Sequence, residues 1–139
     1  MTLGESDRAV FAAIADIIVP AWERMPAASA VGVHVGLLDT VLRARPDLAD
    51  GVHQAIEHCR DREPSEAVNS LYRENRAAFD AFTLAVTGGY YMADKVRVLL
   101  GYPGQESPEY DPYETAQYLT DGILERVTRR GAIYRPTPR

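Results

Sequence analysis

The sequence is poor in cysteine and has no long apolar run. Cys59 is the single cysteine among 139 residues, so no disulfide can form within the chain, which fits a reducing compartment. No stretch approaches the roughly 20 apolar residues that a helix needs to cross a bilayer. The first residues lack the positive charge, the apolar segment and the twin arginines of export signals. We therefore expect a cytoplasmic protein without a membrane span.

Positive charge is also scarce. The formal net charge of −5 argues against nucleic acid or an anionic membrane as the main partner. Five arginines nevertheless follow residue 125, and we interpret them as a solvated helix end placed favourably against the helix dipole, with a binding patch as the alternative. The apolar fraction of 46% and the charged fraction of 25% are ordinary for one globular domain of this length.

The chain lacks the common catalytic and nucleotide-binding motifs. It contains no Gly-x-Ser-x-Gly, no phosphate-binding Gly-x-x-x-x-Gly-Lys and no dinucleotide Gly-x-Gly-x-x-Gly. His53 and Glu57 are four residues apart and share a helix face, but His58 points elsewhere, so the spacing matches neither His-Glu-x-x-His nor its inverse. Cys59 lies on an apolar stripe and reads as a buried structural thiol. We predict no catalytic, cofactor-binding or metal-binding residue.

What the sequence does contain is helical periodicity, and no segment alternates with the period of a strand. We expect an all-α fold, a single domain over residues 1–139 with five to seven helices. The first helix should be capped by Ser6 or Asp7 and end at Pro20; the second should run from about Ser29 to Arg43. Further helices are expected after Pro46, after Pro64, from Asn75 to Gly88, and from about Tyr118 to Gly131.

Two glycine-containing breaks bracket a short segment rich in Val and Leu. We interpret Gly88-Gly89 and Gly101-Tyr102-Pro103-Gly104 as turns, because glycine tolerates positive φ and proline cannot continue a helix. Residues 105–113 should form an ordered loop rich in Pro and Tyr, and the last residues an extended tail. The loop from Pro20 to Ala30 holds the only tryptophan, which either folds back over the core or faces a partner.

Aromatic residues at such turns and loops are typical of interfaces. The alternative is that the same rings close the core and hydrogen-bond loop backbone. The residues that we predict to contact a partner protein are Trp22, Tyr90, Tyr91, Tyr102, Pro103, Tyr110 and Tyr113.

Several of these motifs together resemble the gluconate 2-dehydrogenase subunit 3 family. The similar segments are Ile17-Ile18-Val19-Pro20 at a helix end, the small-residue entry Ala28 to Val33, Gly89-Tyr90-Tyr91, and the turn Gly101 to Gly104. They span most of residues 1–104, whereas residues 105–139 continue past the pattern with a loop, a final helix and a tail that we cannot match. Many family members also carry a twin-arginine signal, which is not seen in this sequence.

The resemblance implies a helical, non-catalytic small subunit. Such a subunit clamps onto, stabilises or helps to export a large FAD-dependent sugar or alcohol oxidoreductase of the glucose–methanol–choline type. FAD would then be bound by the partner and no cofactor by this chain. Two other functions stay open: a free-standing helical protein that homo-oligomerises or binds a small ligand between its helices, and a small enzyme that uses His53, Glu57 and a tyrosine.

Overall fold

The computed structural model describes residues 3–107 and 116–133, and these residues form helices without any strand. The all-α prediction is therefore confirmed, and so is the expected number of helices, since six of them have seven or more residues. The chain divides into two units, Met1–Gln105 and Glu106–Arg139. Tyr110, Tyr113 and most of the expected loop over residues 105–113 lie outside the described residues.

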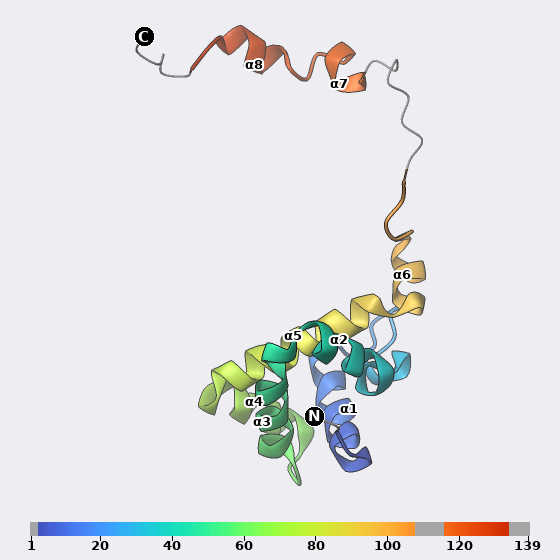
Figure 1. The fold of residues 1–139 in the computed structure, drawn as a ribbon, viewed down its shortest axis with the longest axis vertical. Coiled ribbons are helices and arrows are strands. Elements are labelled where there is room, and N and C mark those ends of the chain that lie inside the picture. The colour runs from blue at the N-terminus through green and yellow to red at the C-terminus, as the bar shows by residue number, and fades with distance from the viewer. Residues whose placement is uncertain (1–2, 108–115, 134–139) are drawn as a thin grey trace. The chain divides into compact units, whose positions relative to one another are not determined.

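Unit 1 contains six α-helices and three short segments of tighter or wider helix (Figure 1). The α-helices are α1 (Glu5–Ile18), α2 (Leu38–Ala44), α3 (Ala49–Cys59), α4 (Pro64–Glu74), α5 (Arg76–Met92) and α6 (Asp94–Leu100). The short segments are the 3₁₀ turns η1 (Ser29–Val31) and η3 (Pro46–Leu48) and the π-helical segment η2 (Val33–Leu37). The described part of unit 2 contains α7 (Gln117–Thr120) and α8 (Glu125–Arg130).

Local chemistry explains most of the helix ends. Pro64 opens α4, where its missing N–H costs nothing, and the Glu63 carboxylate accepts a hydrogen bond from the Glu66 amide at 2.8 Å. The Asn75 side chain caps α5 by accepting from the Ala78 amide. The predicted cap of α1 was wrong: Gly4 is the N-cap, and its amide donates to the Asp7 carboxylate at 3.0 Å, so Asp7 caps from inside the first turn.

The expected second helix is broken into η1, η2 and α2. Gly32 adopts φ +75°, a left-handed conformation that ends η1, and the backbone of Val35 leaves the helical region within η2. Arg8 of α1 stabilises this irregular stretch by donating to the carbonyl oxygens of His34 and Val35 and to both carboxylate oxygens of Asp39. The sequence periodicity of this stretch did not reveal the break, because its apolar residues keep helical spacing on both sides of it.

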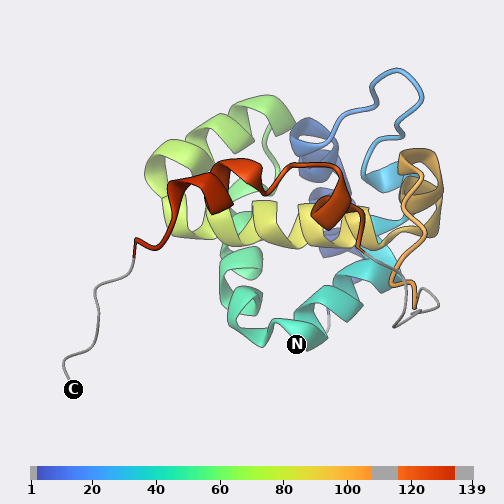
Figure 2. The same ribbon diagram turned by 90° about the horizontal axis from the view of Figure 1, so that it is seen from above.

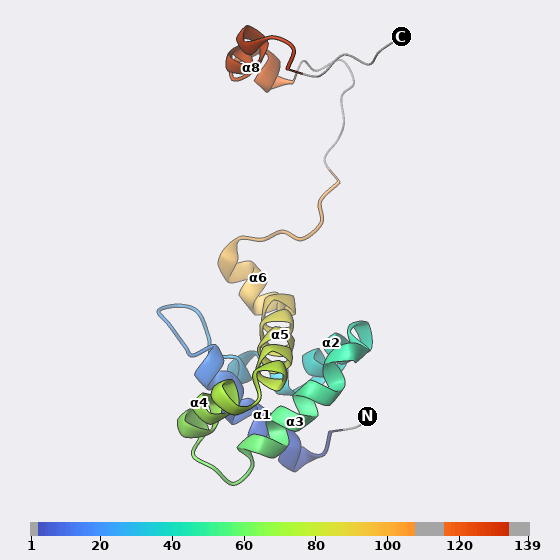
Figure 3. The same ribbon diagram turned by 90° about the vertical axis from the view of Figure 1, so that its left-hand side faces the viewer.

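Helix α5 is the central element of unit 1. It contacts α1, α2, α3, α4, α6 and η2, and in Figure 3 it is seen nearly end-on with the other helices around it. The core that it completes has the Phe11 and Phe82 rings in contact, with centroids 4.7 Å apart. Among residues 3–107 and 116–133, the buried apolar residues all belong to unit 1.

The prediction of a turn at Gly88-Gly89 was wrong, since α5 passes straight through both residues. Gly89 instead serves a close helix contact: a Cβ placed there would lie 2.9 Å from Val33 Cγ1. At Gly88 the same atom would lie at an ordinary 3.7 Å from Val41. The second predicted turn is confirmed, because Gly101 has φ +66° and ends α6, with the Tyr102 amide donating to the Arg97 carbonyl and the Gly101 amide to that of Val98.

These two adjacent glycines should respond oppositely to alanine. Gly88→Ala should raise the free energy of unfolding by up to about 1 kcal/mol, because alanine favours a helix and its methyl group fits. Gly89→Ala should lower it by about 1 kcal/mol, since the buried Val33 side chain must move. Urea unfolding of the two variants of the full chain measures the difference. Equal effects would show that α5 and η2 do not approach closely at Gly89.

An ion-pair cluster joins α1 to the end of α3. The Arg60 guanidinium lies 2.7 Å from the Asp7 carboxylate and 2.6 Å from that of Glu57. The hydrogen bond from Arg60, and then that from the Gly4 amide, hold the pKa of Asp7 below its usual value. Asp7 therefore favours the folded state when it is ionised.

The contribution of Asp7 to stability should depend on pH in a defined direction. It is fully present above the unfolded-state pKa of about 3.9 and is lost as the pH falls through the lower pKa of the folded state. Asp7→Asn should thus unfold at lower urea than the wild type at pH 7, and the two should converge in strong acid. Glu5→Gln, in the same helical turn, is the control for the helix dipole. A constant difference at all pH values would contradict this.

Candidate partner-binding surface

The loop between α1 and η1 presents the only tryptophan to solvent. Trp22 and Met25 close a tight turn, with the Trp22 amide donating to the Met25 carbonyl at 3.0 Å and the reverse bond at 2.8 Å. Met25 packs against the core, whereas the Trp22 side chain is 73% exposed. The loop projects beyond the helices of unit 1 in Figures 2 and 3. Within this loop Met25 folds back over the core and Trp22 faces solvent.

Several buried or half-buried contacts hold this turn in place. The Tyr90 hydroxyl of α5 donates to the Pro26 carbonyl at 2.7 Å, and the Ala28 amide donates to the Val19 carbonyl at 3.1 Å. The Asp16 carboxylate of α1 accepts from the amide and the hydroxyl of Ser29. The turn itself contains Glu23 at φ +50°, which is uncommon for a residue other than glycine. The Trp22 turn, residues 22–25, is thus closed by its own two backbone hydrogen bonds and followed by a segment that α1 and α5 hold.

Tyr90 does not belong to a partner surface. Its side chain is only 4% exposed, and burial raises the pKa of its hydroxyl. The prediction that it contacts a partner is corrected, because its hydroxyl is used within the chain to hold Pro26. The sequence could not separate it from Tyr91, the next residue, which is exposed and stacks edge-on against the Tyr90 ring.

The other described interface candidates gather around α6. Tyr91, Tyr102 and Pro103 are exposed, and Tyr102 follows the left-handed Gly101. The same stretch, residues 91–103, exposes further apolar side chains, of which Val98 is the most open at 79%; only Ala93 and Val96 in it are buried. We call residues 91–103 the α6 region. Its aliphatic members were missed because short apolar runs read as core in a sequence.

A shallow groove of about 470 Å³ borders the α6 region. Its walls come from the segment around η2 and from the junction of α5 and α6. The lining is mostly apolar and includes Val31, Val35, Leu37 and Met92, with Asp94 and Lys95 at the α6 side. The groove therefore extends the apolar surface from α6 onto η2.

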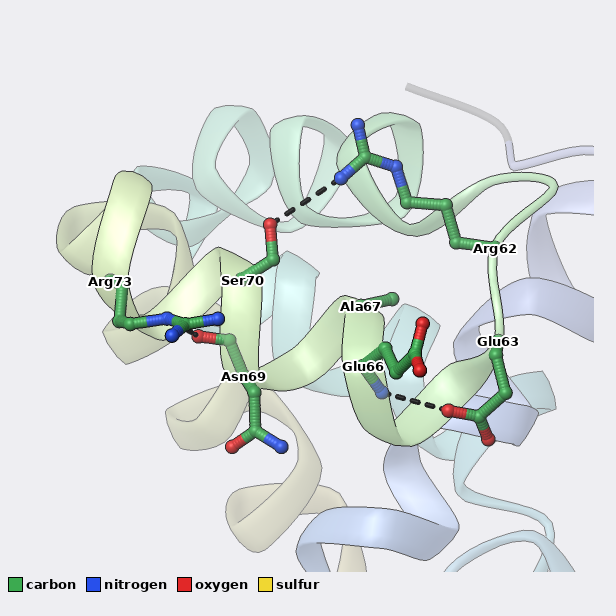
Figure 4. A pocket seen from close by; sticks show the side chains of 7 residues that line it. All are labelled: Arg62, Glu63, Glu66, Ala67, Asn69, Ser70 and Arg73. Carbon is green, nitrogen blue, oxygen red and sulfur yellow. Dashed lines mark hydrogen bonds between the residues drawn. The ribbon is translucent and has the colours of Figure 1, made fainter.

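A second, more polar hollow of about 560 Å³ lies on α4 (Figure 4). Arg62 points toward Ser70, and the Glu63 carboxylate accepts from the Glu66 amide. Ser70 donates to Glu74 at 3.0 Å and lies 2.8 Å from His58 Nε2, so His58 acts as the donor in that pair. In this network the Ser70 hydroxyl donates to Glu74, and Arg62 donates to Ser70.

The other candidates for chemistry are not brought together. Glu57 pairs with Arg60. Cys59 is buried, as predicted, and burial raises the pKa of its thiol. Within the described part of the chain, no three His, Cys, Asp or Glu side chains converge in a way that would hold a metal ion.

Comparisons with protein-family models, with curated proteins and with solved structures gave no match for this chain. Among the residues that the structure describes, no helix combines the length and the apolar character needed to cross a bilayer. Functional inference therefore depends on the motifs of the sequence and on the surface just described.

Removing the Tyr90 hydroxyl group tests its hydrogen bond to the Pro26 carbonyl. Tyr90→Phe should lower the free energy of unfolding by about 1 kcal/mol, because the half-buried Pro26 carbonyl loses its donor. Tyr91→Phe, at an exposed hydroxyl one residue away, should leave it unchanged. Chemical denaturation of the full chain compares the two variants. A loss of equal size in both would mean that Tyr90 does not anchor the loop.

Proposed function

We propose that this chain is a non-catalytic accessory subunit that binds and stabilises a large FAD-dependent oxidoreductase of the glucose–methanol–choline type. The resemblance of its motifs to the gluconate 2-dehydrogenase subunit 3 family supports the identity of the partner. The geometry of unit 1 supports the role, because it offers apolar surface where an enzyme would need convergent polar groups. FAD and the oxidation would belong to the partner.

The Trp22 turn is the observation that carries the proposal. A tryptophan that is mostly exposed loses the benefit of burying a large ring, and here the turn also contains a residue in a left-handed conformation. Hydrogen bonds nevertheless fix the turn rather than letting Trp22 fold onto the core. Rigid exposed tryptophans are typical anchors of protein interfaces, where one such residue often contributes much of the binding energy.

The α6 region is a second exposed apolar part of unit 1. Val98, Leu100 and Tyr102 are all more than half exposed on or just after a helix of seven residues. Contiguous apolar patches of this kind mark interaction sites when they exceed what a monomer usually exposes. A partner that covers them would bury the aliphatic side chains that unit 1 leaves in water.

Affinity purification of the chain from its native host should recover a large yellow protein with a flavin absorption spectrum. Trp22→Ala should weaken binding of that protein by about 30-fold, as expected for a central aromatic anchor. Tyr72→Ala is the matched control. Tyr72 is also a large aromatic residue and is 48% exposed, but it lies on α4, outside both the Trp22 turn and the α6 region. Its effect should stay below about fivefold.

Two results would contradict the proposal. A colourless eluate with this chain alone, whose mass by light scattering equals two or more copies, would favour a free-standing helical protein that homo-oligomerises. A flavoprotein that binds the Trp22→Ala and Tyr72→Ala variants equally well would leave the partner in place but remove the Trp22 turn from the interface.

A further inference from the structure

Residues 116–133 form an amphipathic segment that has no core of its own. Taken by itself, the described part of unit 2 leaves every residue from 117 to 133 exposed. The exposed apolar side chains of this segment are Tyr118, Leu119, Ile123, Leu124, Val127 and Ile133. Its helices have only four and six residues, well below the length at which an isolated helix is stable in water. The segment therefore needs a surface that covers it.

The charge beside the apolar residues indicates the chemistry of that surface. Val127 of α8 lies three residues after Leu124 and four after Ile123, the two apolar residues that immediately precede the helix; we call these three residues the α8 stripe. Arg126 and Arg130, four apart, run next to the α8 stripe. Arg129 lies on the other side, where it pairs with Glu125 at 3.4 Å. The α8 stripe thus combines apolar residues at the start of α8 with guanidinium groups beside them.

The segment also has a built-in bend. Gly122 has φ +75°, and the Asp121 carboxylate accepts from the Ile123 amide at 3.0 Å, so the chain turns between α7 and α8. A membrane surface favours a longer and continuous amphipathic helix, whereas a protein groove can match a bent one. A symmetric contact between two α8 helices would bring their arginines together, because each helix has three arginines and one glutamate.

We propose that residues 116–133 bind an apolar groove on the partner protein whose rim is lined with carboxylates. This inference rests on the proposed accessory function and names a second contact, separate from the Trp22 turn. The apolar side chains would supply most of the affinity, and Arg126 and Arg130 would orient the segment along the acidic rim. The segment would complete its helical structure on that groove.

The experiment measures the affinity of full-chain variants for the flavoprotein that the wild-type chain recovers, at low and at moderate salt. Ile123→Ser combined with Val127→Ser should weaken binding by about tenfold or more. Arg126→Gln combined with Arg130→Gln should weaken it severalfold at low salt and reduce its salt dependence. Arg129→Gln, the matched control on the other side of the helix, should change affinity by less than about twofold.

Other results would overturn the inference and can be told apart from a failure of the proposed function. If Trp22→Ala weakens binding while the α8 stripe and arginine variants bind normally, the accessory function stands and the second contact does not exist. If no flavoprotein is recovered, both the proposed accessory function and the second contact are contradicted.

Three further measurements test other occupants of the α8 stripe, and a positive result in any of them would overturn the proposal. Binding of the wild-type chain to phosphatidylglycerol vesicles, lost in the Arg126→Gln and Arg130→Gln variant, would assign a lipid surface. A dimeric mass that Ile123→Ser and Val127→Ser reduce to a monomer would assign a second copy. A lower midpoint of thermal unfolding in the Ile123→Ser and Val127→Ser variant, measured without any partner, would show that the α8 stripe already stabilises the folded chain.

Discussion

The close approach of neighbouring elements to α5 is the constraint on which unit 1 depends. A Cβ atom at Gly51 of α3 would lie 2.5 Å from the Ala81 methyl group of α5, and one at Gly89 of α5 would lie 2.9 Å from Val33. Small residues at these two points let α3 and η2 reach the central helix along most of its length. The larger rings, such as Phe11 and Phe82, then fill the space that remains.

The same helix connects the core with the surface. Tyr90 lies one residue after Gly89, with its ring buried and its hydroxyl bound to the loop that carries Trp22. The segment that follows the Trp22 turn is therefore held by α5, and under the proposed function the turn would already be ordered before it binds the partner. An anchor that is ordered in advance avoids part of the entropy that binding otherwise costs.

Much of the fold could be predicted from the sequence because its signals are local. Apolar spacing around Phe11 and Ile14, the prolines at 46 and 64, and Gly101 each specify a helix or a helix end without help from distant residues. Gly89 was wrongly predicted to form a turn, because the residue that requires a glycine there, Val33, lies more than fifty positions away in the sequence. The candidate partner-binding surface was harder to predict from the sequence. Tyr90 and Tyr91 are adjacent tyrosines, and only the packing of α5 decides which of them is buried.

Unit 1 and residues 116–133 are subject to different limits on sequence change. Substitutions in unit 1 must preserve a packed interior, so most of its buried positions accept few alternatives. Residues 117–133 bury nothing among themselves, so no interior of their own limits their substitutions. Under the proposed function, folding depends on the interior of unit 1 and part of the partner binding depends on residues 116–133, so the two properties belong to separate stretches of the chain.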